Sequence, residues 1–433
     1  TMARKMKDSG IEWIGEIPEE WSKNKVIRLF DIIGSGTTPK NITSDFPVVN
    51  WIQSGDITGS FMPTCKNVIS ANLLSQYSAL KVYPAPFIII AMYGASVGNA
   101  SISLIDGCVN QACCVLSSPS CNLHYAFYVI KSAQSYLVRK AVGGGQPNIS
   151  QETIKQLWLP LPPLSTQDII VRNLDATCSK IDDLLSSVHA SIEEYKKLKQ
   201  AVITLAVTKG VRGEREMKDS GVEWIGEIPA EWSITKIKSG VTKIGSGKTP
   251  SGGAETYTDS GVIFLRSQNI YDCTLNLESP TYISPEVDAT MKSTRVLPDD
   301  VLLNITGGSI GRCSIVPKTL GLANVNQHVC IIRTNPLIFL PKYMQYFWVS
   351  TLGHLAIDLY QTGGNREGMS ADAIRNTPIP YAPLNEQKEI ADYLDAKCAE
   401  IDKLIAKKEQ LVKELESYKK SLIYEVVTGK REV

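Results

Sequence analysis

The chain carries a direct internal repeat, and this repeat limits its possible folds more than any other feature. Residues 6–21 read MKDSGIEWIGEIPEEW and residues 217–232 read MKDSGVEWIGEIPAEW, so fourteen of sixteen positions are identical at an offset of 211. The match continues as Ile33-Gly-Ser-Gly36 against Ile244-Gly-Ser-Gly247. Two copies of one sequence within 433 residues predict two structural units of the same kind.

A second strong match closes each copy. Residues 160–184 align with residues 380–404 at an offset of 220, whereas the segments between head and tail share only short islands. These islands are Ser54–Ile57 with Ser267–Ile270, Gly94–Gly98 with Gly307–Gly311, and Asn110-Gln111 with Asn326-Gln327. Each half therefore has a constrained head, a divergent middle and a constrained tail.

The two tails are predicted to be long helices. Ser165 and Asn385 follow prolines and are good N-cap residues, and Gly210 and Gly429 stand where the helices would end. Apolar residues recur between them at steps of three, four or seven, as in a coiled coil. Such a helix needs a partner, and chain order makes a pair of these two antiparallel. The predicted seam includes Ile181, Leu185, Ile192, Ile401 and Leu415. Two separate helical hairpin arms are the alternative.

The middles are predicted to be mixed α/β. The segments 48–52, 87–92, 101–104, 262–265 and 301–305, with glycine-rich turns between them, are typical of strands, and residues 123–141 and 341–360 are typical of helices. The fold class is therefore α+β, with two mixed α/β domains joined by two long antiparallel coiled-coil helices in a pseudo-two-fold repeat. We expect domains at 1–162 and 211–382, and spacer helices at 163–210 and 383–433.

Composition excludes several protein classes. No run of about 18 apolar residues exists, so no membrane association is expected. The N-terminal segment lacks an apolar signal region, and the ten cysteines are scattered without C-x-x-C pairs. These features suit the reducing cytoplasm and argue against a metal site. With 45 basic and 44 acidic residues, the chain is not a basic nucleic-acid coat, although a local basic patch is compatible with this balance.

Motifs for catalysis are missing. Gly247-Lys248-Thr249 resembles part of a phosphate-binding P-loop, but position 242 is Thr where that motif needs Gly. We interpret this segment as a glycine-rich turn whose backbone amides, with the lysines, hold a DNA phosphate. Glu386 and Asp372 resemble a nuclease metal site only faintly, and a role at the helix start explains Glu386 better. No catalytic residue, metal ligand or cofactor is predicted in this chain.

Polar residues beside glycines in the two middles remain as candidates for DNA contact. Arg, Asn and Gln are the side chains that read base edges bidentately, although such residues also occur in ordinary loops. The candidates of the first copy are Lys40, Gln53, Ser54, Ser96, Asn99, Gln111, Gln146 and Asn148. Those of the second copy are Lys248, Arg266, Gln268, Asn269, Ser309, Arg312, Gln327 and Arg366.

The whole pattern resembles the specificity subunit of a type I restriction–modification system. The resemblance covers nearly the whole chain and rests on motifs that recur in order: the heads Trp13–Trp21 and Trp224–Trp232, the Gly-Ser-Gly-x-Thr-Pro loops, the helix starts Pro163–Gln167 and Pro383–Gln387, and the closing Val427–Lys430. It implies two target-recognition domains, each reading one half of a split site in double-stranded DNA. It also implies that the helices dock two methyltransferase subunits and, through them, restriction (helicase–nuclease) subunits.

Under this resemblance the chain itself is non-catalytic. S-adenosylmethionine, ATP and Mg²⁺ are expected in the partner subunits. The main alternative is a scaffold that binds no DNA and carries two binding domains on a helical rod. An enzyme with an unrecognised site is a second alternative, and the lack of one catalytic set shared by both copies argues against it.

Overall fold

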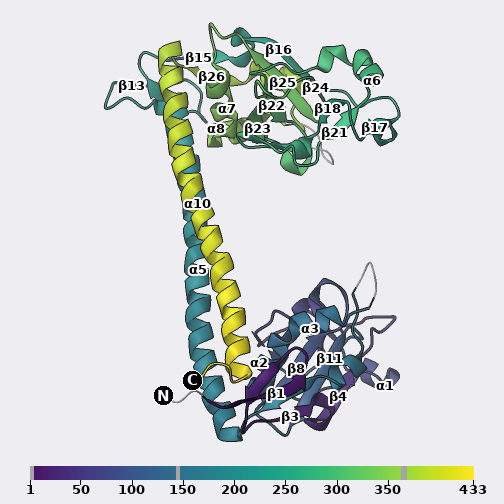
Figure 1. Cartoon of the computed structure of the whole chain (residues 1–433). Helices are drawn as coiled ribbons and strands as arrows, with labels where there is room; N and C mark the ends of the chain where they lie inside the picture. Colours follow the sequence, from purple (N-terminus) through teal and green to yellow (C-terminus); the bar gives the residue numbers. More distant parts are fainter. Residues whose placement is uncertain (1–3, 143–146, 362–367) are drawn as a thin grey trace. The chain divides into compact units, whose positions relative to one another are not determined.

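The computed structural model describes residues 4–142, 147–361 and 368–433 (Figure 1). The chain divides into two compact units: unit 1 takes residues from 1–188 and 410–433, and unit 2 takes residues 189–409. The two long helices, α5 (Leu164–Lys209) and α10 (Leu384–Val427), each contribute one part to each unit. Neither sequence copy therefore builds a unit from its own residues alone.

Unit 1 is organised around a five-stranded sheet in the order β4-β11-β8-β9-β6. These strands are β4 (Phe30–Ser35), β6 (Phe61–Met62), β8 (Phe87–Ala91), β9 (Ala100–Ser103) and β11 (Cys113–Pro119). A three-stranded sheet, β10-β5-β7, adds β5 (Val48–Ile52), β7 (Val68–Ser70) and β10 (Cys108–Val109). The shorter pairs are β1 (Met6–Ile11) with β2 (Gly15–Pro18), and β3 (Ser22–Lys25) with β12 (Trp158–Leu161). The shorter helices are α1 (Leu73–Gln76), α2 (Leu123–Ser132), α3 (Gln134–Arg139) and α4 (Gln151–Lys155).

Strand β8 is buried on both faces, which explains its uninterrupted apolar sequence. Alternate residues of a strand point to opposite faces. Ile88 and Ile90 pack in the cluster that contains α2 and the helix pair, while Phe87 and Ile89 pack in a second cluster with Ile52. The sheet therefore lies between two cores and is held in place from both sides.

Unit 2 repeats this arrangement. Its central sheet has the order β16-β25-β22-β23 and a second sheet has the order β17-β21-β18-β24. The first consists of β16 (Val241–Ser246), β22 (Val301–Asn304), β23 (Cys313–Ile315) and β25 (Val329–Thr334). The second consists of β17 (Tyr257–Thr258), β18 (Val262–Leu265), β21 (Thr281–Ile283) and β24 (Ala323–Val325). The short pairs are β13 (Met217–Asp219) with β14 (Glu227–Pro229), β15 (Ser233–Lys236) with β26 (Pro378–Tyr381), and β19 (Ile270–Tyr271) with β20 (Thr274–Leu275).

The predicted helices of the middles are each divided in two. Residues 123–141 form α2 and α3, and residues 341–360 form α7 (Pro341–Val349) and α8 (Thr351–Tyr360). Ser350 causes the second break, because its backbone is extended and its side chain caps α8 by accepting from the Gly353 amide. Unit 2 also contains α6 (Pro285–Thr290) and α9 (Ala371–Asn376).

Within each unit the segments of α5 and α10 run antiparallel. In unit 1, Lys419 Nζ lies 2.5 Å from Asp182 Oδ1, and in unit 2, Lys199 Nζ lies 2.7 Å from Asp402 Oδ1. Apolar residues lie between the helices, as in a coiled coil. Of the predicted seam residues, Ile181, Ile192 and Ile401 are buried, and Leu185 and Leu415 are half-buried. The predicted fold class, with its repeat and its antiparallel helices, is confirmed.

The starts of the two long helices differ from the prediction. The helices begin at Leu164 and Leu384, each one residue before the predicted N-cap. Ser165 and Asn385 therefore lie inside the first turn and are not N-caps. A buried glutamine three residues after each helix start anchors it instead. Gln387 donates to the carbonyls of Ala382 and Ile338, each at 2.8 Å, and accepts from the Leu340 amide at 2.9 Å.

Gln167 repeats most of this arrangement in unit 1. It donates to the Pro162 carbonyl and accepts from the Asn122 amide, each at 2.9 Å. The glutamine of each Pro-Leu-x-x-Gln motif therefore fixes a long helix to the segment that begins α2 or α7.

Candidate nucleic-acid interface

In unit 1 the sheet brings several predicted DNA-contact residues to one edge. Strands β4 and β8 end beside the start of β11, as the registers Ser35↔Cys114 and Ala91↔Cys113 show. The loops that leave this edge carry Lys40, Ser96 and Gln111. The Thr38 hydroxyl donates to Gln111 Oε1 at 2.6 Å and joins two of these loops.

The smaller sheet adds its own strand ends to this group. β5 and β10 are parallel and end together, and the Asn110 amide donates to the Ile52 carbonyl at 3.1 Å. Gln53 and Ser54 follow β5 directly, so both lie near Gln111. Asn148 reaches the group through a bridge to Tyr93.

Unit 2 builds the same edge from its own strands. β16 and β22 end beside the start of β25, with the registers Ser246↔Cys330 and Asn304↔Val329. The Asn326 amide donates to the Leu265 carbonyl at 3.0 Å, as Asn110 does to Ile52. The loops at this edge carry the candidates Lys248, Arg266, Gln268, Ser309, Arg312 and Gln327.

Two arginines at this second edge rest on aromatic rings. Arg312 lies over Tyr271 with 4.7 Å between the guanidinium carbon and the ring centroid, and Arg266 lies over Tyr257 at 5.6 Å. Both arginine side chains are half-buried. An aromatic face favours one orientation of the planar guanidinium.

Some candidates are engaged within the protein. Asn269 is buried, its Oδ1 accepts from the Arg266 amide at 2.9 Å, and its Nδ2 donates to the Asn276 carbonyl at 3.0 Å. Asn99 donates to the Ile57 carbonyl at 3.0 Å, and Ser309 accepts from Asn304 at 3.1 Å. Asn269 therefore shapes the turn that presents Arg266. Gln146 and Arg366 lie outside the described residues.

The structure also draws attention to Thr306, which the sequence candidates did not include, and to His328, which is one of the polar candidates that the sequence offers in the second middle. The Thr306 hydroxyl lies 2.6 Å from His328 Nδ1, and His328 Nε2 lies 3.1 Å from Gln327 Nε2. Tyr93 occupies the place of Thr306 in the first copy and is 42% exposed. Each residue directly precedes the Gly-x-Ser of an aligned island, and this shared position was the available signal.

The glycine-rich loops are shaped by close backbone contact. A Cβ atom on Gly247 would lie 2.0 Å from the Val325 carbonyl oxygen, and one on Gly36 would lie 1.6 Å from that of Val109. The amides of Gly247 and Lys248 donate to the carbonyls of Val329 and Val325. These two amides are engaged within the protein, which contradicts the prediction that they hold a phosphate. A phosphate contact by the lysine side chains stays a prediction.

Cysteines near this edge are not suited to thiolate chemistry. Burial raises the pKa of Cys114 and of Cys330 to about 12 for each. No group of three or more His, Cys, Asp or Glu side chains that suits a metal ion occurs within residues 4–142, 147–361 and 368–433. None of the helices in these ranges is long and apolar enough to span a membrane.

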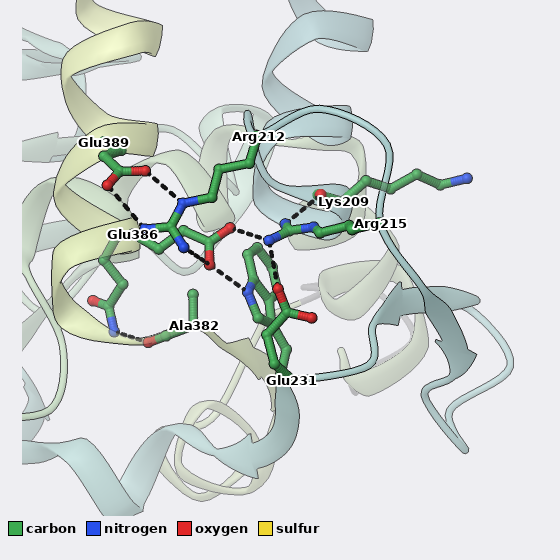
Figure 2. Close-up of polar contacts among 9 residues, drawn as sticks. Lys209, Arg212, Arg215, Glu231, Ala382, Glu386 and Glu389 are labelled. Atoms are coloured by element: carbon green, nitrogen blue, oxygen red, sulfur yellow. Dashed lines mark hydrogen bonds and ion pairs between the residues drawn. The ribbon is translucent and has the colours of Figure 1, made fainter.

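A second polar cluster lies where α10 begins (Figure 2). Glu386 is fully buried, and its Oε2 accepts from Trp232 Nε1 at 2.9 Å while its Oε1 lies 2.6 Å from Arg215 Nη1. Arg212 pairs with Glu389 at 2.8 Å and lies 3.8 Å from Glu386. Two arginines therefore balance the charge of the buried carboxylate, and an indole N–H donates a hydrogen bond to it. This explains Glu386 as a structural acid.

Comparisons of sequence and of fold with known proteins both lead to one protein family. The family model of the type I restriction modification DNA specificity domain matches residues 18–194 and 229–414. A putative type I restriction enzyme MjaX specificity subunit of Methanocaldococcus jannaschii is 26% identical over 96% of this chain and 95% of its own length. The EcoBI specificity subunit of Escherichia coli is 24% identical over 81% of this chain and 75% of its own length.

Solved structures agree at the level of the fold. A chain from a study of complex assembly and conformational transition of the type I R-M system superposes with a TM-score of 0.73 at 15% identity, covering 95% of this chain and 98% of that one. The HsdS subunit from Thermoanaerobacter tengcongensis gives a TM-score of 0.51 at 15% identity over 96% and 98%. With two matched domains covering most of its length, the chain belongs to the family of type I restriction–modification DNA specificity subunits.

Proposed function

We propose that this chain recognises a bipartite DNA site, with one half-site read by the loop edge of each unit. The observation that carries the proposal is that both units have the same loop framework, whereas the side chains that these loops present differ between the units. The turn after β5 presents Gln53, and the equivalent turn after β18 presents Arg266. The residue directly after the aligned Gly-x-Ser-x-Gly island is likewise Asn99 in one copy and Arg312 in the other.

These exchanges alter the bases that each edge favours. Arginine pairs bidentately with guanine, and glutamine or asparagine with adenine. Residues 1–160 hold 13 basic and 10 acidic residues, whereas residues 214–380 hold 15 and 17. Because residues 214–380 have a net charge of −2, we expect a partner subunit to supply part of the phosphate contact.

We further propose that the helix pair docks two methyltransferase subunits and, through them, restriction subunits. In this complex the chain supplies specificity and no catalytic step. S-adenosylmethionine would be bound by the methyltransferases, and ATP and Mg²⁺ by the restriction subunits. The complex would work in the cytoplasm, where its DNA substrate is found.

The test measures methylation on duplexes that carry every single-base change across both half-sites. Arg266→Ala should relax one position of one half-site, at a cost of about 1–3 kcal/mol for a lost bidentate contact. Gln53→Ala should relax a position of the other half-site only. Lys318→Ala is the matched control, because Lys318 follows β23, whose Ile315 pairs with the opposite end of β22.

Two results would contradict the proposal. Equal loss at both half-sites from either variant would show that the units do not read separately. Absence of any sequence preference in the complex with methyltransferase would favour the scaffold that binds no DNA.

A further inference from the structure

A pocket lies beside the start of α5 in unit 1, at the place that corresponds to the Glu386 cluster of unit 2. Its wall includes Arg4, Trp21, Thr166, Ile169 and Arg431. The two places can be compared directly, because the heads align at an offset of 211 and the helix starts at an offset of 220.

The groups that donate hydrogen bonds are present in both copies. Trp21 corresponds to Trp232, and Arg4 corresponds to Arg215. Each arginine lies over its tryptophan ring, at 5.3 Å in unit 1 and 5.2 Å in unit 2. Arg431 stands two residues after the glycine that follows α10, as Arg212 stands two residues after the glycine that follows α5.

The acids that receive these bonds are present only in unit 2. Thr166 replaces Glu386, and Ile169 replaces Glu389. Trp21 is 1% exposed, and its Nε1–H finds no acceptor among the described residues. A buried donor without a partner is unfavourable, so binding of an acceptor that reaches the Trp21 N–H is stabilised.

The arginines of unit 1 are also less engaged. Arg4 pairs with Glu20 at 2.9 Å, as Arg215 does with Glu231, but Arg215 has the Lys209 carbonyl and Glu386 as well. Arg431 lies 3.9 Å from Glu425. Glu432 also lines the pocket, and within residues 4–142, 147–361 and 368–433 no hydrogen bond joins it to Arg4 or Trp21.

We propose that this pocket binds the carboxylate of an acidic side chain on a partner protein. The carboxylate would accept from Trp21 Nε1 and pair with Arg4 and Arg431, as Glu386 does with their counterparts. A protein is favoured over a small anion because Ile169 in the pocket wall is an apolar side chain that is 45% exposed. The inference deepens the proposed docking of a methyltransferase and rests on it.

The first test asks whether the pocket takes a carboxylate at all. The full chain is labelled with ¹⁵N-tryptophan, and sodium acetate is titrated against sodium chloride at constant ionic strength. Trp21→Phe identifies the Trp21 indole resonance. We expect that resonance to move downfield and saturate with acetate. In Thr166→Glu, which restores the acid of unit 2, it should be shifted from the start and should not respond. No saturable shift, or an equal response in Thr166→Glu, would overturn the carboxylate pocket.

The second test asks whether a partner protein uses the pocket. Binding of the methyltransferase subunit is measured for the wild type, for Thr166→Glu and for Ser165→Glu. Ser165→Glu adds the same charge to an exposed neighbour that does not line the pocket. Thr166→Glu should weaken binding about tenfold, the size of a lost charge-assisted hydrogen bond, and Ser165→Glu less than twofold.

The outcomes separate this inference from the proposed function. Equal binding of the methyltransferase by both variants would overturn the proposal that a partner protein inserts a carboxylate into the pocket. A wild-type chain that binds no methyltransferase would contradict the proposed function, while the acetate titration would still decide whether the pocket takes a carboxylate.

Discussion

Single backbone contacts set the shape of the loops at the sheet edges that carry the candidate DNA-contact residues. Gly247 lets the loop after β16 pass within contact distance of the Val325 carbonyl, at the end of the neighbouring sheet. Gly36 does the same against Val109 in unit 1. The third residue of each Gly-Ser-Gly motif therefore joins two sheets and places the loop that follows.

The first prediction tests this contact. Gly247→Ala would put a methyl group 2.0 Å from a carbonyl oxygen, and we expect a loss of about 1–3 kcal/mol of unfolding free energy. Gly245→Ala is the control, because a Cβ at this residue of the same motif meets nothing within 4 Å. Urea unfolding of both variants provides the measurement, and equal stability would show that the close contact does not constrain the loop.

For single residues, the sequence predicts where a candidate side chain lies better than it predicts whether that side chain contacts DNA or stabilises a turn. Alignment of the copies selected Gln53, Arg266 and Asn269, all of which the structure places at the two turns. It did not show that Asn269 is buried and bonded to the backbone, because Asn is equally common in turns that it stabilises and in sites that read bases. Deciding between these roles requires the direction of each side chain.

The anchoring of the long helices depends on one buried amide in each copy. Gln387 forms hydrogen bonds with two backbone carbonyls and one backbone amide, and no other described side chain forms a hydrogen bond with these three groups. Removing its side chain would leave all three buried groups without these bonds.

We expect Gln387→Ala to cost about 2–4 kcal/mol of stability, since several buried polar groups lose their partners. Lys388→Ala is the adjacent control: Lys388 is exposed and pairs only with Asp392, so its loss should cost less than about 0.5 kcal/mol. Thermal unfolding of both variants decides the matter. Similar melting temperatures would mean that the α10 start is fixed by packing alone.

Elements were predictable where burial imposes a strong pattern. The strands at 48–52, 87–91 and 262–265 follow from apolar runs, since a strand between two cores is apolar throughout. The division of residues 341–360 was not predicted, because serine favours N-caps but also occurs within helices, and a single serine does not show which place it takes. Tertiary packing decides between these states: Val349 and Leu352, which flank the Ser350-Thr351 break, are both buried.

The whole molecule is assembled from interleaved parts of the chain. Unit 1 takes its last helical segment from residues 410–433, which follow all of unit 2 in the sequence. This segment supplies buried residues to the core of unit 1, namely Leu422, Ile423, Val426 and Val427.

Deletion of residues 410–433 should therefore unfold unit 1 and leave unit 2 folded. Four buried apolar side chains contribute roughly 1.5–3 kcal/mol each, which together approaches the whole stability of a typical domain, about 5–15 kcal/mol. Limited proteolysis should cut within residues 1–188 and spare 211–361. Lys419→Ala, which removes one surface ion pair from the same segment, should leave the wild-type pattern. Protection of residues 1–188 in the deleted chain would contradict the division into these units.

The pseudo-two-fold repeat also predicts a stoichiometry. Each unit offers antiparallel segments of α5 and α10, so the active complex should hold two methyltransferase subunits for each specificity chain. Native mass spectrometry of the DNA-bound complex provides the measurement. A ratio of one to one in the methylating complex would show that only one of the two sets of segments binds a partner.

The interleaving has a consequence for synthesis on the ribosome. Residues 1–188 emerge first, yet the core that contains Ile170 and Leu174 lacks the apolar side chains of residues 422–427 until residues 410–433 have been translated. At about 5–20 residues per second, translation of the intervening segment takes roughly 10–40 seconds. During that interval the nascent chain presents an apolar strip that a chaperone can bind, and unit 2 has time to fold before unit 1 is complete.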